Sequence, residues 1–271
     1  MKKICLLLII IMCFSIKAYS KPLTVRYFQT DHRYDYRTEL LKLVLESTAG
    51  SDGPFSLEPV KTDMTQGRAL VYLEEGKNVD IASLATNAGR EKRFLVVRIP
   101  ILRGILGYRV FIIHKENLKK FSEIETLEQL KTNFKAGFGL HWADMKILKH
   151  NNIPVEGVSE YKSLFRMLSS RRFDYFPRGI NEAWKEISEM GSKYPNLTVE
   201  PNIAVYYPYP VYFFVNKQNL KLADRIERGL KRVTKDGSFE KLFLKYHDAV
   251  IRQADLKNRK MFVLKNPVPT K

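Results

Sequence analysis

Three short polar segments follow apolar runs and could gather around a small solute: residues 30–34, 62–66 and 83–90. The first segment holds Asp31 and Tyr34, side chains that could line one wall of a site. In sheets flanked by helices, ligands sit beyond the carboxyl ends of the strands. We therefore expect these three segments to face one cleft.

No set of residues indicates a familiar type of catalytic centre. The chain lacks the G-x-S-x-G, H-E-x-x-H and G-x-x-x-x-G-K motifs, and its histidines do not show metal-ligand spacing. Asp31 or Glu182 could exchange protons with His141 across a cleft, which is the enzyme alternative. We expect a binding protein rather than an enzyme, with no cofactor and no metal.

The first 20 residues have the pattern of a secretory signal peptide. Two lysines precede an apolar run, residues 4–16, and the segment ends in Ala18-Tyr19-Ser20. The run is short for a transmembrane anchor. Cys5 and Cys13 both lie in this segment, so the exported chain would have no disulfide and no thiolate chemistry. We expect an exported protein that depends on its hydrophobic core for stability.

The chain is strongly basic, with a formal charge of +17. Lys2, Lys3 and Lys17 account for three of these charges, so the exported chain keeps +14. Export argues against a nucleic-acid partner, although basic proteins often bind nucleic acids. A solvated basic surface explains the charge, and attraction to anionic solutes or an anionic membrane face is the alternative.

Two similar runs, residues 108–118 and 211–220, divide the chain. Each is rich in β-branched and aromatic residues and ends in Lys-x-Asn-Leu. We interpret them as buried strands that cross between two lobes; two unrelated core strands are the alternative. Elsewhere strands alternate with helices, which predicts an α/β fold with mostly parallel sheets. The predicted parts are lobe one (21–113 and 211–257), lobe two (114–210) and a basic tail (258–271).

The order of elements resembles that of the type-two periplasmic solute-binding proteins, and in particular the polar amino acid-binding family of ABC transport systems. Residues 79–82 followed by 86–91 resemble the family's strand and its Thr-to-Arg loop. Phe173-Asp174-Tyr175-Phe176 resembles a strand near the second lobe's binding edge, and Asp236-Gly237-Ser238 resembles the turn into the last helix. The resemblance covers nearly the whole exported chain. It implies two lobes, each a mostly parallel sheet flanked by helices, joined by two hinge crossings that close around a solute.

The resemblance also implies ligand contacts. Thr86 and Arg90 match the loop whose arginine grips a ligand carboxylate in a two-bond fork. Basic neighbours of Arg90 leave a solvated surface arginine as the alternative. His141 and Trp142 stand where the family has Gly-Thr at a helix start, a position that favours an anion. Trp142 could stack on a ring or cation, or anchor the core, and His141 could donate a hydrogen bond or be structural.

Arg178 departs from the family pattern. In amino acid binders this edge, or a position next to it, supplies a carboxylate for the ligand's ammonium group. Glu182, one helical turn further on, could supply that carboxylate instead. Otherwise the ligand is an acid without an α-amine, or carries two anionic groups. A salt bridge from Arg178 to Asp174 or Glu182, away from the cleft, is the alternative.

These patterns predict a monomeric solute-binding protein of the periplasm. It would clamp a small anionic or amino-acid-like solute between its lobes and deliver it to an inner-membrane permease. A ligand sensor that docks onto a membrane signalling receptor is the alternative, because its folded chain would look the same. A cleft acid–base enzyme is the less favoured third possibility.

Overall fold

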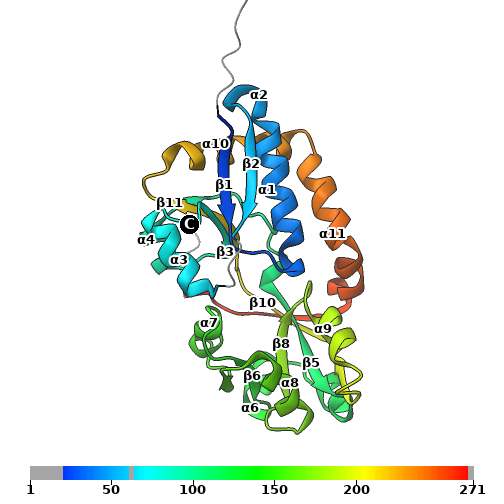
Figure 1. Ribbon diagram of the computed structural model, residues 1–271. Coiled ribbons are helices and arrows are strands. Elements are labelled where there is room, and N and C mark those ends of the chain that lie inside the picture. The colour runs from blue at the N-terminus through cyan, green and yellow to red at the C-terminus, as the bar shows by residue number, and fades with distance from the viewer. Residues whose placement is uncertain (1–20, 61–63, 268–271) are drawn as a thin grey trace, which may run out of the picture.

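The computed structural model describes residues 21–60 and 64–267, so the predicted signal peptide lies outside the described residues. Two mixed sheets, each flanked by helices, form two lobes, one above the other in Figure 1. The predicted two-lobed α/β fold is confirmed. Within the described residues, no helix has the length and apolar character needed to cross a membrane.

Lobe one is built on a five-stranded sheet. Strand β1 runs parallel to β2 and β3, whereas β11 runs antiparallel to β3 and β4. Helices α1 and α10 pack together on one side, and α3 packs against β3 and β11. The elements are β1 (Leu23–Tyr27), α1 (Asp35–Ser47), α2 (Ala49–Asp52), β2 (Phe55–Pro59), α3 (Gln66–Glu75), β3 (Ile81–Ala85), α4 (Ala88–Arg93), β4 (Phe94–Val97), β11 (Val211–Asn216), α10 (Leu220–Lys235) and α11 (Ser238–Ala254).

Strand β11 is buried on both faces, which explains its unbroken apolar sequence. Val211, Phe213 and Val215 join the main core cluster, whereas Tyr212 and Phe214 join a second cluster with Leu70 and Leu73 of α3. Successive side chains of a strand point to opposite faces. A strand covered by helices on both sides therefore needs apolar residues at every position.

Lobe two contains a seven-stranded sheet in the order β12-β10-β5-β8-β6-β7, with β9 beside β5. Strand β5 runs antiparallel to β8, β9 and β10, whereas β6 runs parallel to β7 and β8. The elements are β5 (Tyr108–His114), α5 (Leu118–Ser122), α6 (Leu127–Asn133), β6 (Ala136–Gly139), α7 (Met145–His150), β7 (Val155–Val158), α8 (Tyr161–Ser169), β8 (Tyr175–Gly179), α9 (Ala183–Met190), β9 (Leu197–Val199), β10 (Ile203–Tyr206) and β12 (Lys260–Val263).

Both sheets are mixed rather than mostly parallel. The strands responsible are β5 and β11, the two apolar runs that the sequence singled out. Each enters its sheet directly after a crossing, without the helical connection that a parallel neighbour needs. The chain therefore lays each of them antiparallel to the strands at its side.

The first crossing lies before β5, not within it. Strand β5 pairs with β8, β9 and β10, so residues 108–113 belong to the lobe-two sheet, although the sequence placed them in lobe one. The chain leaves lobe one after β4 and returns between β10 and β11.

Gly107 and Tyr207 meet where these crossings run side by side: the Tyr207 N–H donates to the Gly107 carbonyl at 3.1 Å. A Cβ at Gly107 would lie 2.3 Å from the Tyr207 carbonyl oxygen, so this approach requires glycine.

The described chain makes a third crossing where the sequence predicted a basic tail. After α11, which packs on α1 and α10 in lobe one, β12 pairs parallel with β10 in lobe two. Arg259 anchors the turn by donating to the carbonyls of Ala254 and Ile203. The segment predicted as a basic tail, residues 258–271, therefore contains a strand, because residues 260–263 pair with the edge of β10.

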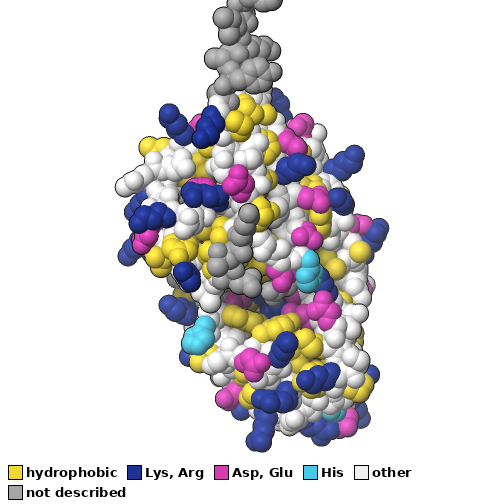
Figure 2. Space-filling model, viewed as in Figure 1, with side chains coloured by type: hydrophobic (Ala, Val, Ile, Leu, Met, Phe, Trp, Pro, Cys, Tyr) yellow, Lys and Arg dark blue, Asp and Glu magenta, His cyan; other side chains and the backbone are white. Residues whose placement is uncertain are grey.

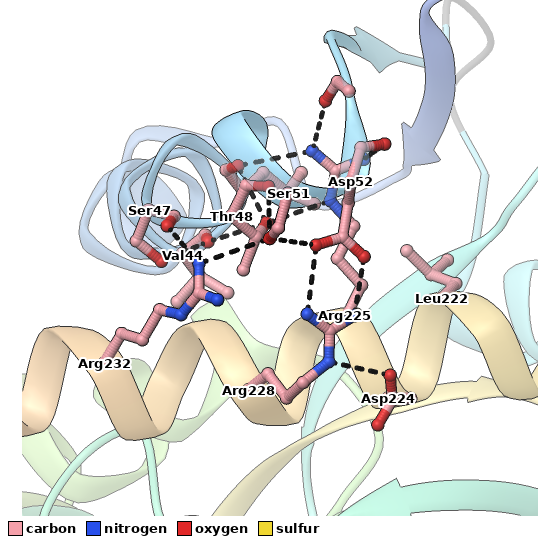
Figure 3. A network of polar contacts seen from close by, with 12 residues as sticks. Val44, Ser47, Thr48, Ser51, Asp52, Leu222, Asp224, Arg225, Arg228 and Arg232 are labelled. Atoms are coloured by element: carbon pink, nitrogen blue, oxygen red, sulfur yellow. Dashed lines mark hydrogen bonds and ion pairs between the residues drawn. The ribbon is translucent and has the colours of Figure 1, made fainter. Parts of the chain in front are cut away.

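Arginines of α10 hold the carboxyl-terminal end of α1 in lobe one (Figure 3). Arg225 is buried and donates to the Thr48 hydroxyl at 2.9 Å and to the carbonyl of Gly53 at 2.9 Å. Arg232 donates to the carbonyl of Ser47 at 2.8 Å. The last carbonyls of a helix lack partners within the helix, and cations there also interact favourably with the helix dipole. This network fixes α10 on α1, the helix that leads into the cleft.

We predict that Arg225→Ala lowers the free energy of unfolding by about 2–3 kcal/mol, because it leaves buried oxygens without donors. Urea denaturation followed by circular dichroism measures this loss. Arg228→Ala is the matched control, since Arg228 lies one turn along α10 and pairs with Asp52 at the exposed surface. Equal effects of the two substitutions would contradict the role assigned to burial.

Candidate functional site

A cavity of about 470 Å³ lies between the two lobes. Both lobes line it, which distinguishes it from a hollow of about 340 Å³ that lobe one alone lines. Its position beyond the carboxyl ends of β3 and β8 matches the placement expected for ligands in such sheets. Its lining comprises Gln29, Tyr34, Arg37, Gln66, Leu84, Ala85, Arg90, Leu106, Arg109, His141, Trp142, Ala143, Asp144, Tyr161, Arg178, Glu182 and Tyr209.

Six of the eight residues that the sequence singled out line this cavity: Tyr34, Arg90, His141, Trp142, Arg178 and Glu182. Thr86 and Asp31 do not. Thr86 is buried and donates its hydroxyl proton to Glu91 at 2.6 Å, so its hydroxyl already has an acceptor within lobe one. Asp31 is exposed beside His32. That the six lining residues bind a ligand stays a prediction.

Arg109 organises the wall of lobe two. It lies at the start of β5 and is buried, and its guanidinium donates to the Tyr207 hydroxyl at 2.8 Å and to Asp144 at 2.7 Å. A third bond reaches Glu182 at 3.2 Å, and Tyr207 donates its own proton to Asp144 at 2.8 Å. Gly179 faces Arg109 in the strand register, where a Cβ would lie 2.9 Å from a Glu182 oxygen. The glycine therefore leaves room for the carboxylate.

Arg178 lines the cavity, but its charge is already paired. It donates to Glu186 of α9 at 2.7 Å through Nε and lies 3.2 Å from the second Glu182 oxygen. The sequence left open whether Arg178 binds the ligand or forms a salt bridge away from the cleft. The structure shows a salt bridge, but in the wall of the cavity. Asp174 is not its partner, since Asp174 accepts from the Lys135 backbone N–H at 2.7 Å.

Trp142 combines both roles that its sequence position suggested. Its ring packs edge-on against Phe138 and stacks on Phe176, with centroids 5.0 and 6.0 Å apart. The guanidinium carbon of Arg178 lies 4.8 Å from its ring centroid. Trp142 therefore does stack on a cation, and that cation is the protein's own arginine. His141, the residue before it, is exposed at the rim of the cavity.

Lobe one contributes two arginines that have no carboxylate partner within the described residues. Arg90 follows Asn87, whose side chain caps α4 by accepting from the Arg90 backbone N–H at 2.9 Å. The Arg90 guanidinium donates to the carbonyl of Ala85. Arg37, on the first turn of α1, donates to the carbonyl of Ser83 at 3.0 Å and lies over the Tyr34 ring at 4.9 Å.

The pKa shifts divide the four cavity arginines into two pairs. For Arg109 and Arg178 burial alone would lower the pKa, but their acidic and tyrosine partners outweigh it, so both pKa values lie above the usual range. For Arg37 and Arg90 burial dominates and lowers the pKa. The lobe-two cations are thus neutralised by the fold, whereas the lobe-one cations are not.

Glu182 is the acidic group that the cavity presents. Burial would raise its pKa, but the charges of Arg178 and Arg109 and the Gly179 N–H outweigh it, so the pKa lies below the usual range. Its side chain keeps 29% of its surface exposed, whereas that of Asp144 keeps 5%. An ionised carboxylate with free surface can accept hydrogen bonds from an ammonium group of a ligand.

The sequence analysis missed three charged groups of the wall: Arg37, Arg109 and Asp144. One signal for Arg109 was present, because an arginine inside the apolar run of residues 108–113 is buried only with a partner. Asp144 is that partner, 35 residues away in sequence. Arg37 gave no such signal, since a single basic residue on an amphipathic helix is usually solvated.

No family model matches the sequence, and no curated protein matches it. Solved structures with the same fold do exist. An ancestral arginine-binding protein bound to arginine is 19% identical, with a TM-score of 0.58 over 84% of this chain and 99% of that one. A structure reported for glutathione import through a cystine ABC importer of Streptococcus mutans is 18% identical, with a TM-score of 0.59 over 83% and 94%. A probable amino-acid ABC transporter extracellular-binding protein from Bacillus subtilis is 20% identical, with a TM-score of 0.58 over 84% and 97%.

At these identities the likeness shows the fold, the two-lobed type-two periplasmic-binding-protein fold, over nearly the full length of each neighbour. The resemblance found in the sequence is confirmed at this level. The solute of this chain does not follow from the neighbours.

We predict that Arg109→Met lowers the free energy of unfolding by about 3–5 kcal/mol, because Asp144 would stay buried without its cation. Chemical denaturation measures the loss. Adding Asp144→Asn to this variant should restore part of it, since one uncompensated charge disappears. If the double variant lost as much free energy of unfolding as the two single variants lose together, direct coupling between Arg109 and Asp144 would be contradicted.

Proposed function

We propose that the protein is a periplasmic solute-binding protein that closes its two lobes around an amino acid and delivers it to an inner-membrane permease. Arg90 holds the carboxylate of the solute from lobe one. Glu182 accepts hydrogen bonds from its ammonium group on lobe two. The chain acts as a monomer, with one solute in the cavity between the lobes.

The observation that carries this proposal is the opposite charge of the two walls. Arg90 has no acidic partner among the described residues and faces a cavity that Glu182 also lines. A zwitterion whose ammonium and carboxylate groups are bonded to the same carbon complements such a pair of walls. Because each wall belongs to a different lobe, binding of both charged groups would favour the closed arrangement.

The structures of similar fold agree with this kind of solute, since those named above concern arginine, amino-acid transport and glutathione import. The enzyme alternative has less support. A general acid or base works best with a pKa near the operating pH, whereas the charges of Arg178 and Arg109 lower the pKa of Glu182 below its usual range.

The distribution of charge on the surface agrees with the simple explanation that the basic side chains are solvated. On the face shown in Figure 2, Lys and Arg side chains are spread over both lobes with Asp and Glu among them, and they do not gather in one field. Several are paired, as are Arg93 with Glu74 and Arg98 with Glu91. Mixed surface charge of this kind favours solubility.

We predict that Arg90→Ala removes ligand-induced stabilisation while leaving the ligand-free fold intact. An amino acid at 100 times its dissociation constant raises the free energy of unfolding by about 2.7 kcal/mol through mass action, and a thermal-shift screen of amino acids detects this. Arg93→Ala is the matched control, because Arg93 lies one turn away on the same helix and pairs at the surface. Undiminished binding by Arg90→Ala would exclude Arg90 from the site, and a screen without any responding amino acid would contradict the proposal.

We also predict that a saturating amino acid closes the lobes, because the two walls hold oppositely charged groups of one solute. Small-angle X-ray scattering should show a smaller radius of gyration with ligand than after the bound solute is removed. Glu182→Gln should weaken this response, since it removes the charge on the lobe-two wall. Identical scattering profiles with and without a ligand that is known to bind would contradict closure.

A further inference from the structure

The carboxyl end of β3 holds two guanidinium groups on the lobe-one wall. Arg37 donates to the carbonyl of Ser83 at 3.0 Å, and Arg90 donates to the carbonyl of Ala85. Alternate carbonyls of a strand point to the same side, and two residues of a strand span about 6.6 Å. The two cations are therefore anchored next to each other on one wall, at a spacing that the strand fixes.

These anchors exist because β3 continues past the end of β1. The register between the two strands ends with Tyr27 and Ile81. The carbonyls further along β3 lack a strand partner on that side, and buried carbonyls need a donor. Gln29 supplies one by donating to the Ser83 carbonyl at 2.9 Å, and the two arginines supply the others. Each guanidinium uses one of its two terminal nitrogens for this bond, so further N–H groups are available toward the cavity.

The charges of the two walls do not balance. The lobe-two wall combines Arg109 and Arg178 with Asp144, Glu182 and Glu186, which gives a net charge of −1. The lobe-one wall combines two cations that have no acidic partner of their own among the described residues. A zwitterion with no net charge would leave one guanidinium in the closed cavity without a counter-charge, and burying such a charge is costly.

We propose that the solute carries a second anionic group, which Arg37 binds, so that the protein prefers amino acids with an acidic side group. This inference rests on the proposed function, because it assigns the ammonium to Glu182 and the first carboxylate to Arg90. The ammonium group of such a solute then faces the lobe-two wall, which has a net negative charge. Its two anionic groups face the two guanidinium groups of lobe one. The second group is a carboxylate, a phosphate or a sulfonate, since all three suit the planar fork of an arginine.

The surroundings of Arg37 fit this role. Its guanidinium lies over the Tyr34 ring, which limits its freedom, and the bond to Ser83 fixes its direction. A hollow of about 20 Å³ beside it is lined in part by Gln29, Thr38 and Ser83. This hollow holds roughly one water-sized group, so a polar anion that reaches Arg37 can stay partly hydrated or gain a further hydrogen bond.

Glu182 is the alternative source of negative charge for Arg37. Its negative charge acts on Arg37 across the cavity, and closure of the lobes could neutralise Arg37 without any second anion. In that case an acidic amino acid and its uncharged amide would bind equally well. The comparison between an acid and its amide therefore separates the two arrangements.

The experiment measures affinity by isothermal titration on protein freed of bound solute by unfolding and refolding. The probes are three matched pairs: L-glutamate with L-glutamine, L-aspartate with L-asparagine, and O-phospho-L-serine with L-serine. We expect the acidic member of at least one pair to bind at least tenfold more tightly than its neutral partner. The pair with the larger preference identifies the second group as carboxylate or phosphate.

Two variants then assign the preference to Arg37. Arg37→Gln should remove the preference for the acid while the neutral partner still binds, because Arg90 and Glu182 are unchanged. Arg37→Lys should keep part of the preference, since it keeps the charge but loses the fork. Lys42→Gln is the control: it removes one positive charge from the exposed face of the same helix, where Lys42 lies near Glu46, and should leave the preference intact.

The outcomes separate this inference from the function on which it rests. Amides that bind as tightly as the acids, or a preference that survives Arg37→Gln, would overturn the inference and leave the amino-acid site standing. A chain that binds no amino acid of any kind, acidic or neutral, would overturn the proposed function itself. Loss of the preference in Lys42→Gln as well would show a general field effect and would also overturn the role of Arg37.

Discussion

Buried charge in the wall of lobe two is the constraint on which the arrangement of the cleft depends. Arg109 and Arg178 are both buried in β5 and β8, and neither could stay there without acidic partners. Asp144, Glu182 and Glu186 come from the residue before α7 and from the start of α9, so the ion pairs tie these segments to the sheet. Glu182 is thereby fixed as an ionised group with free surface before any ligand arrives, which reduces the reorganisation that binding requires.

The same network affects how the lobes can move. Tyr207, which bonds to Arg109 and Asp144, lies in the return crossing, so this crossing is fastened to lobe two. On the other side, the Thr86 N–H donates to the Pro210 carbonyl at 3.0 Å, which fastens the crossing to lobe one. Only a few residues remain between the two attachments. Hinge motion concentrates in such short segments. The third crossing, at Asp255 between α11 and β12, is a further covalent connection between the lobes.

The fold was largely predictable because its signals are local and repeated. The double-sided burial of β11 appears as an unbroken apolar run, and the alternation of strands with helices predicts the α/β class. Strand β12 was not predicted, since its apolar run of three residues, 261–263, is short and lies among basic residues, and it pairs only with the edge of β10. The crossing was misplaced for a related reason: an apolar run shows that a strand is buried, but it does not show which of two sheets buries it.

The site was predictable only where a residue follows a strand or departs from a familiar pattern. Arg90, Arg178 and Glu182 gave such signals, and all three line the cavity. Arg37 did not, because only the first turn of α1 reaches the cleft, whereas Lys42 and Glu46 further along the same helix are exposed, and the sequence does not record where a helix passes from solvent into a cleft. Asp144 was also hidden, since its partner lies on a distant strand.

Arg37 and Arg90, which have no carboxylate partner in the part of the chain that the structure describes, leave positive charge on the lobe-one wall unbalanced. Their lowered pKa values show that the fold disfavours their charged forms, in contrast to Arg109 and Arg178. A solute that supplies the missing negative charge removes this cost and binds with the free energy so released, whereas a neutral analogue of the same shape does not. Under the proposed assignment of Arg37 and Arg90, selectivity and ligand-dependent stability have one physical origin, because the solute supplies the negative charge that the lobe-one wall lacks.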